Sequence, residues 1–342
     1  MDLTSLPATD PLDIYRQRDG LYAVDLLTAA LTEFDFFTWL ADRPGTPEAI
    51  GRGLGLATRP LDVMLTLFAA EGYLERKQGG ELHLTGLARE HLVRTSPFFI
   101  GPYFGSLKER PVVRDYVTVL RTGHPANWGS YRHEKPWSDA MLTDEFATTF
   151  TAAMDCRGRY LGAALADKLD LSGHTRLLDI AGGSGIYACT LVARHPHLTA
   201  TVLERPPVDN IARTMIRRRE SEAKVDVKAG DMFADPLPGG YDVHLFSNVL
   251  HDWDVDKVAP LLAASFAALT LGGMLLVHDA HVNATKTGPL PVAKYSALLM
   301  NITEGKCYSV AEMESLLGAA GFRDVRHLPT AADRSVITAR KP

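Results

Sequence analysis

The sequence predicts an α/β protein with an open, mostly parallel sheet in its second half and a helical region before it. From about residue 176 onward, apolar runs of strand length alternate with helical patterns, the rhythm of strands joined by crossover helices. Before residue 100, apolar residues recur at helical spacing in segments that proline and glycine residues separate. The tail, 324–328 and 334–339, can add an antiparallel pair of strands at one edge of the sheet.

Length, charge and cysteine content narrow the class of protein. A chain of 342 residues is long enough for two domains. Its formal charge of −5 argues against a nucleic-acid partner, which usually meets a basic face. The three cysteines lie far apart without a CxxC pair, which favours a reducing, cytoplasmic setting. No apolar run is long enough to span a membrane, so we expect no membrane partner.

Residues 1–100 have the order of a winged helix. Thr46-Pro47 is a helix start, with an N-cap residue followed by proline. In the next helix Leu61, Met64, Leu65 and Phe68 share one face. Two short strand-like runs, 73–76 and 81–84, then flank a Gln-Gly-Gly turn and read as a hairpin.

The charge of this segment argues against DNA binding. Phosphate contacts dominate affinity for DNA, so a binding face should be basic. Residues 46–90 hold five Lys or Arg (Arg52, Arg59, Arg76, Lys77, Arg89) against six Asp or Glu (Glu48, Asp62, Glu71, Glu75, Glu81, Glu90). A DNA-binding regulator is therefore disfavoured, and we expect a packing or dimerisation domain.

A connecting region, 101–165, follows and ends in an amphipathic helix. Phe146, Phe150 and Met154 recur every four residues on it. The stripe fits either core packing or the wall of an apolar ligand pocket.

The sheet itself should occupy the second domain, residues 166–342, after the connecting region. Its expected strands are 176–183, 198–205, 225–233, 241–250 and 272–282. The first leads through Gly182, Gly183 and Gly185 into a helix, and such small residues let the backbone approach a ligand closely. The spacing from Gly183 to Ala188 also satisfies the G-x-G-x-x-A dinucleotide fingerprint, so an NAD-dependent oxidoreductase stays open.

Carboxylates near the strand ends favour a different nucleoside. Asp179 stands before the loop, where it would repel a pyrophosphate but suit a cation. Glu204 ends the next strand and can accept hydrogen bonds from a ribose diol. Asp231, with Met232 and Phe233, follows the third strand and can grip an adenine. The set suits a nucleoside that carries an ammonium and a sulfonium.

At this point the chain resembles the S-adenosylmethionine-dependent class I small-molecule O-methyltransferases. The resemblance is to the dimeric caffeate, isoflavone and acetylserotonin type, in a bacterial member. It spans essentially the whole chain and rests on the winged-helix N-terminus, "LLDIAGGSG", "ERPP", "GDMF", "NVLHDWD" and "EGKCYSVAEMESLLGAAGF". It implies a Rossmann-like methyltransferase sheet, a homodimer formed through the N-terminal domain, and S-adenosyl-L-methionine as cofactor, with S-adenosyl-L-homocysteine as product. The implied acceptor is a hydroxyl of an aromatic or polyketide-like small molecule.

By position, the resemblance also implies a set of cofactor-binding residues. Two of them depart from the family pattern: Ala181 stands where glycine is usual, and Ser247 where Lys or Arg often touches the cofactor. The cofactor set is Asp179, Ala181, Gly182, Gly183, Gly185, Glu204, Arg205, Asp231, Met232, Ser247 and Trp253.

His251 is the expected catalytic base, and Asp279 the acid that orients it and stabilises its cation. A phenol of pKa near 10 and a histidine near 6.5 make full proton transfer uphill by about 5 kcal/mol. Transfer must therefore be coupled to methylation or helped by neighbouring groups. Cys307 falls where a second acid is usual, so we expect a weaker base. The expected substrate-binding residues are Phe150, Met154, Asp252, Met300 and Asn301.

Several alternatives stay open at this point. His251 is otherwise a structural strand-end histidine, or forms a metal cluster with Asp279 and His281, although we expect no metal. C- or N-methylation, or a non-methylating reaction that retains the cofactor, fits the same scaffold. The run Arg217–Ser221 is most simply a solvated helix face.

Overall fold

A computed structural model of the chain describes residues 2–125 and 137–342. Residues 126–136, within the predicted connecting region, lie outside the described part. The chain divides into two compact units. The first contains Met1–Leu12, Ser138–His281 and Val310–Pro342, and the second contains Asp13–Trp137 and Val282–Ser309. The predicted domain boundaries at residues 100 and 165 stay a prediction.

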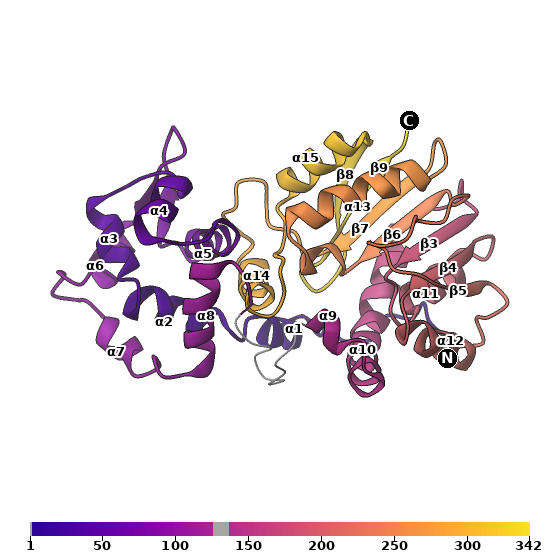
Figure 1. Cartoon of the computed structure of the whole chain (residues 1–342), viewed down its shortest axis with the longest axis horizontal. Helices are drawn as coiled ribbons and strands as arrows, with labels where there is room; N and C mark the ends of the chain where they lie inside the picture. Colours follow the sequence, from indigo (N-terminus) through magenta and orange to yellow (C-terminus); the bar gives the residue numbers. More distant parts are fainter. Residues whose placement is uncertain (1, 126–136) are drawn as a thin grey trace. The chain divides into compact units, whose positions relative to one another are not determined.

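The first unit is built on a seven-stranded sheet with the order β5-β4-β3-β6-β7-β9-β8 (Figure 1). β3, β4, β5, β6 and β7 are parallel, whereas β9 runs antiparallel to β7 and β8. This confirms the predicted α/β class with an antiparallel C-terminal edge. The strands are β3 (Arg176–Ile180), β4 (Thr199–Glu204), β5 (Val225–Ala229), β6 (Val243–Ser247), β7 (Met274–Asp279), β8 (Arg323–Pro329) and β9 (Ser335–Arg340).

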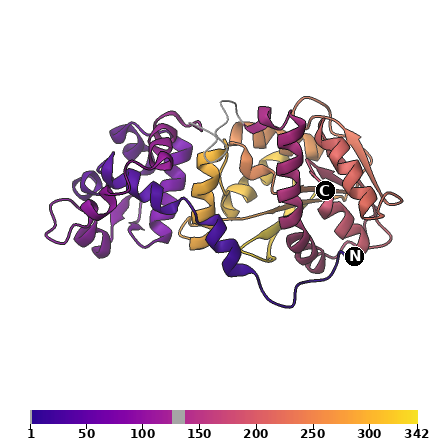
Figure 2. The same ribbon diagram turned by 90° about the horizontal axis from the view of Figure 1, so that it is seen from below.

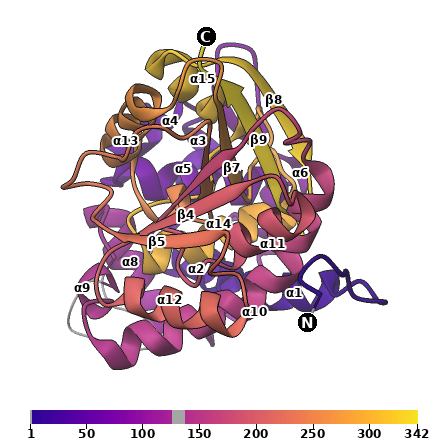
Figure 3. The same cartoon turned by 90° about the vertical axis from the view of Figure 1, so that its right-hand side faces the viewer.

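Helices cover both faces of the sheet, which explains why its central strands read as continuous apolar runs. Figures 1 and 3 show α13 (Val255–Ala268) and α15 (Val310–Ala320) on one face. The helices α10 (Asp144–Lys168), α11 (Ile186–Arg194) and α12 (Val208–Arg218) cover the other face, which is turned toward the viewer in Figure 2. The remaining short elements of this unit are α9 (Trp137–Ala140) and the 3₁₀ turn η2 (Leu250–Asp252).

The strand order places a topological switch point between β3 and β6. From β3 the chain proceeds outward to β4 and β5, and it then returns to the other side of β3 as β6. Ligands of open parallel sheets bind outside the carboxyl ends of the strands at such a point. The loops that follow β3, β6 and β7 therefore define the candidate site.

The second unit is mostly helical. Its core gathers Phe36, Phe37 and Phe68, whose rings lie 5.1–5.6 Å apart. Thr46 caps α4 by accepting a hydrogen bond from Ala49 N–H, as its place before proline predicts. The helices are α1 (Leu12–Asp19, at the boundary), α2 (Ala23–Thr32), α3 (Phe36–Asp42), α4 (Pro47–Leu54), α5 (Thr58–Ala70), α6 (Gly86–His91), α7 (Gly101–Gly105), α8 (Pro111–Thr122) and α14 (Leu290–Ile302).

The expected order of helix, helix and hairpin is present in this unit. β1 (Leu74–Arg76) and β2 (Leu82–Leu84) follow α5 as an antiparallel pair. α14 comes from a distant part of the sequence and packs against α2, α5 and α8 (Figure 1). Across the described residues, no helix is both long and apolar enough to cross a membrane.

Candidate active site

The loop between β3 and α11 turns on residues with positive φ angles: Ala181 at 55°, Gly183 at 57° and Gly185 at 72°. That region costs a non-glycine residue roughly 1–2 kcal/mol, which explains the glycines and makes Ala181 a strained substitute. At Gly182 the reason is space, because a Cβ would lie 2.6 Å from the carboxyl carbon of Asp179. A Cβ on Gly183 would meet no heavy atom of the described chain within 4 Å, so its surroundings are open to a ligand.

Asp179 places a buried carboxylate beneath this loop. The residue is fully buried, and among the described residues neither of its oxygens accepts a well-formed hydrogen bond. Burial raises the pKa of Asp179 to about 7, Glu204 acts in the same direction, and the N–H of Ala188 offsets only part of this. A cation bound at the loop would stabilise the ionised form.

Glu204 ties the loop to the end of β4. Its Oε2 accepts a hydrogen bond from Gly183 N–H at 3.0 Å, and its Oε1 accepts one from Arg205 N–H at 3.0 Å. Burial raises the pKa of Glu204, although these two hydrogen bonds oppose the shift. The half-buried carboxylate thus stands beside the open Gly183 backbone, and its contact with a ribose stays a prediction.

The segment after β5 and the turn after β6 meet through aromatic rings. Asp231 Oδ1 accepts a hydrogen bond from Phe233 N–H at 2.8 Å and so fixes a turn around Met232. The Phe233 ring lies edge to face with Trp253, with 4.8 Å between the ring centroids. The structure therefore brings the predicted adenine-binding segment and Trp253 together.

His251 lies in η2, not at a strand end. β6 stops at Ser247, because Asn248 takes a left-handed conformation with φ of 55° and the chain then folds into a 3₁₀ turn. The predicted strand 241–250 is therefore too long at its carboxyl end. The turn directs the imidazole back toward the end of β7.

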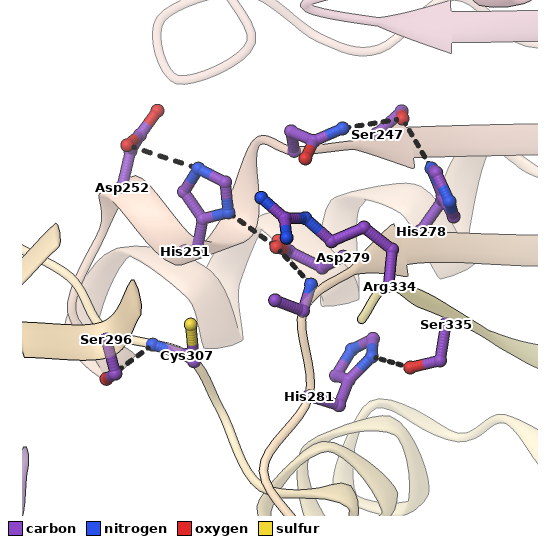
Figure 4. A network of polar contacts seen from close by, with 12 residues as sticks. Ser247, His251, Asp252, His278, Asp279, His281, Ser296, Cys307, Arg334 and Ser335 are labelled. Carbon is purple, nitrogen blue, oxygen red and sulfur yellow. Dashed lines mark hydrogen bonds and ion pairs between the residues drawn. The ribbon is translucent and has the colours of Figure 1, made fainter. Parts of the chain in front are cut away.

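The imidazole of His251 lies between two carboxylates (Figure 4). Its Nδ1 is 2.5 Å from Oδ1 of Asp279, and its Nε2 is 3.5 Å from Oδ1 of Asp252. Asp279 Oδ1 also accepts a hydrogen bond from Ala280 N–H at 2.7 Å. With its Nδ1 proton donated to Asp279, His251 presents Nε2 as the atom that can accept a proton.

The two carboxylates set the charge of this site. Burial acts to lower the pKa of His251, but the charges of Asp279 and Asp252 outweigh it, so the pKa is raised. Burial acts to raise the pKa of Asp279, yet the His251 cation and its hydrogen bond lower it. Burial raises the pKa of Asp252 to about 6, despite the opposing charge of His251.

Ser247 belongs to a network without charge at neutral pH. Its Oγ lies 3.0 Å from Nδ1 of His278, whose Nε2 lies 3.2 Å from Oγ1 of Thr330. Asn248 Nδ2 donates to Ser247 Oγ at 3.2 Å and to the Tyr187 hydroxyl at 3.0 Å. Because burial lowers the pKa of His278 to about 3, this histidine is neutral.

The predicted substrate-binding residues fall in both units. In the first unit, Phe150 and Met154 are half-buried on α10, and the Phe150 ring stacks on that of Phe146 at 5.9 Å. In the second unit, Met300 and Asn301 are fully buried in α14, and Cys307 N–H donates to Ser296 Oγ at 3.1 Å. The substrate-binding roles of Phe150, Met154, Met300 and Asn301, and the role of Cys307, stay predictions.

Arg157 on α10 influences the site but was not predicted from the sequence. Burial has the largest effect on the pKa of His251 and of Asp252, but the positive charge of Arg157 also acts on both. The sequence feature that could have identified Arg157 is its position three residues after Met154, on the helix face that carries the apolar stripe.

The alternative metal cluster is not assembled. His281 follows β7, and its Nδ1 lies 2.8 Å from Ser335 Oγ. No three His, Cys, Asp or Glu side chains in residues 2–125 and 137–342 lie together in a way that could hold a metal ion.

Comparison with known proteins agrees with this geometry. The family model of the O-methyltransferase domain matches residues 118–323. The chain belongs to the S-adenosylmethionine-dependent O-methyltransferase family. Its glycine loop, with an uncompensated carboxylate beneath and open space beside Gly183, fits a cationic nucleoside cofactor.

Three similar proteins illustrate the relationship. A 3-hydroxy-5-methyl-1-naphthoate 3-O-methyltransferase of Streptomyces sahachiroi is 32% identical over 90% of this chain and 88% of its own length. The acetylserotonin O-methyltransferase of Bos taurus is 36% identical over 94% of this chain and 95% of its own. The crystal structure of an O-methyltransferase family 2 protein of Planctomyces limnophilus, in complex with apigenin, is 32% identical with a TM-score of 0.90, covering 100% of this chain and 99% of that one.

Proposed function

We propose that this methyltransferase transfers a methyl group from S-adenosylmethionine to a hydroxyl of an aromatic or polyketide-like small molecule, with His251 as general base. The observation that carries the proposal is the 2.5 Å contact between His251 and Asp279. The pair stands at the end of β7, two strands from the glycine loop across β6. The naphthoate and acetylserotonin acceptors in the names of the similar enzymes, and the apigenin of the solved complex, support the acceptor class.

The cofactor supplies an activated methyl group on a sulfonium, and the chain binds and orients it. We propose that the positively charged part of the cofactor lies near the Asp179 carboxylate, behind Gly182. The ribose diol would bind Glu204, beside Gly183. The Asp231 and Met232 turn, with Trp253, would border the adenine. Backbone groups of Ala181, Gly185 and Arg205, and the hydroxyl of Ser247, complete the set. In this assignment Ser247 provides a neutral contact, since its network carries no charge.

The base has a defined proton path. A neutral phenol is a poor nucleophile, so Nε2 of His251 takes the hydroxyl proton as the new O–C bond forms. Transfer from a phenol to a free imidazole is uphill by about 5 kcal/mol, and each unit by which the His251 pKa rises removes about 1.4 kcal/mol. Asp279 raises that pKa through a buried, charge-assisted hydrogen bond.

On the acceptor side, we propose that Phe150 and Met154 form apolar contacts and that Asp252 lies near the reacting oxygen. Met300 and Asn301 would form further contacts with the acceptor. Cys307 stands where a second acid is usual, so Asp279 would orient His251 without that acid.

We also propose that the N-terminal region forms a winged helix that dimerises and does not bind DNA. Several large apolar side chains are exposed there, which supports a protein partner: Ile14, Leu21, Val24, Leu87, Phe98 and Ile100. Arg59 is the single basic residue of α5, and it is buried with its guanidinium donating to Gly123 O and Gly305 O, each at 2.7 Å. The guanidinium therefore bonds backbone carbonyls inside the protein and cannot reach a DNA phosphate. None of the three cysteines, all of which lie in the described residues, forms a disulfide bond, which supports a reducing, cytoplasmic setting.

Two measurements test the function. Calorimetry should detect binding of S-adenosylmethionine and S-adenosylhomocysteine but not NAD, and tight NAD binding would refute the assignment. A panel of phenols, hydroxynaphthoates and flavones, read by mass spectrometry and NMR, should give methyl ethers; a C- or N-methylated product would reassign the reaction.

With an acceptor in hand, His251→Ala should lower kcat by about 10²–10⁴-fold and keep S-adenosylhomocysteine affinity. His244→Gln is the matched control, because His244 is equally buried in β6 but bonds Ser265 Oγ at 2.9 Å, away from the site. This control should lose stability rather than kcat at a permissive temperature. Activity of His251→Ala within about threefold of wild type would remove the base role.

A further inference from the structure

The glycine loop needs external support. Ala181, Gly183 and Gly185 all have positive φ angles within five residues. Such a backbone persists only where its surroundings determine it. On one side Glu204 accepts the Gly183 N–H, and within the loop Gly185 N–H donates to Gly182 O at 2.9 Å. The peptide between Ser184 and Gly185 has a different support.

That support comes from Arg219, which lies at the end of α12. Its Nη1 donates to the carbonyl of Ser184 at 3.2 Å. Its Nη2 bonds the carboxylate of Asp155 on α10. The two side chains are only 13% and 22% exposed, so solvent screens their interaction less than that of a surface pair. The prediction of a solvated face for Arg217–Ser221 is therefore wrong at Arg219.

The arrangement joins three parts of the fold at the cofactor loop. Arg219 is the C-cap residue that directly follows α12, Asp155 belongs to α10, and Ser184 lies in the turn between β3 and α11. Asp155 holds the guanidinium in place, and the guanidinium holds the loop carbonyl. A charged donor makes a stronger hydrogen bond than a neutral one.

We propose that Arg219 and Asp155 are a positioning pair that fixes the Ser184–Gly185 peptide in the conformation that receives the cofactor. This inference rests on the proposed function, since it assigns the cofactor to this loop. In this proposal the pair does not contact cofactor or acceptor directly. It acts through the loop, so its effect belongs to cofactor binding and not to the methyl-transfer step.

The test compares Arg219→Met, Arg219→Lys, Asp155→Asn and the Met/Asn double variant by calorimetry with S-adenosylhomocysteine. We expect Kd to rise about tenfold in Arg219→Met and less in Arg219→Lys and Asp155→Asn. The double variant should bind S-adenosylhomocysteine no more weakly than Arg219→Met does, because the Asp155 carboxylate acts through Arg219. KM for S-adenosylmethionine should rise in parallel, while kcat at saturation stays within about threefold.

Arg194→Met is the matched control. Arg194 on α11 forms an ion pair, at 3.2 Å, with Asp167, which lies on α10 as Asp155 does. Within the described residues, Arg194 forms no hydrogen bond or ion pair with the loop. Its variant should bind S-adenosylhomocysteine as wild type does. Kd values of Arg219→Met and Asp155→Asn within twofold of wild type, even with a lowered Tm, would overturn the proposal and leave a purely structural pair.

The outcomes also separate the two proposals. Wild-type protein that fails to bind S-adenosylhomocysteine refutes the proposed function itself. Binding by wild type together with equal binding by the variants refutes only the positioning role. If Arg219→Met does not fold, the milder Asp155→Asn and Arg219→Lys decide.

Discussion

Gly182 lies directly over the carboxyl group of Asp179, so close that a Cβ on the glycine would fall 2.6 Å from the carboxyl carbon. The contact closes the loop over a charge that no well-formed hydrogen bond in the described chain compensates. The folded protein thus carries an electrostatic cost at the place where the proposed cofactor carries positive charge. Two opposite effects of one substitution follow.

Asp179→Asn should stabilise the cofactor-free protein at high pH. The folded pKa of about 7 lies above the ordinary 3.8, so wild-type stability present below pH 3.8 is lost as the pH rises toward 7. The variant avoids that loss, and its advantage over wild type should grow between pH 4 and 8 by up to about 4 kcal/mol. Urea unfolding across this range measures it, and the same variant should bind S-adenosylhomocysteine more weakly.

The control is Asp167→Asn, which alters a half-exposed carboxylate on α10. Because this carboxylate reaches solvent, its removal should not give the gain in stability expected for Asp179→Asn. If the Asp179→Asn advantage is also independent of pH, the buried carboxylate is not ionised in the folded protein.

Asp279→Asn should move the acid limb of the pH–rate profile to lower pH. The base must be neutral to accept a proton, and Asp279 helps to raise the His251 pKa against burial. Without that charge the pKa falls, so His251 is neutral at lower pH, while kcat/KM on the plateau drops about 10–100-fold. Asp252→Asn should shift the limb less, because Asp252 lies 3.5 Å from the ring and not 2.5 Å. A limb that stays in place or moves to higher pH contradicts the assignment.

Ala181→Gly should stabilise the protein by about 1 kcal/mol, since the residue holds a φ of 55° that glycine adopts freely. Chemical denaturation measures the gain. Ala263→Gly, at an exposed alanine inside helix α13, serves as the comparison and should lose about 1 kcal/mol. Equal losses at both positions would mean that the loop holds Ala181 without strain.

Features that depend on local pattern were predicted well from the sequence. The helix start at Thr46 and the apolar face of α5 follow from capping and periodicity, and both are present. The antiparallel edge of β8 and β9 also appears as expected. The end of β6 was not predictable, because the left-handed turn at Asn248 interrupts an apolar run without a glycine or proline signal.

The site residues that were missed depend on packing between distant elements. Arg157 and Arg219 look like ordinary helix-surface cations in the sequence. α10 approaches α11 closely at Gly158, where a Cβ would lie 2.4 Å from Ile186, and this contact accompanies the inward placement of the neighbouring arginine. Charge periodicity alone cannot reveal such an approach.

The interleaving of the two units has a consequence for synthesis on the ribosome. The second unit begins at residue 13, but α14, which packs on α2, α5 and α8, arrives only with residues 290–302. At 5–20 residues per second, the helices before residue 137 wait roughly ten to thirty seconds for their partner. Throughout that time the apolar surface that α14 will cover stays exposed. A nascent chain of this design is therefore a natural client for chaperones that bind near the exit tunnel.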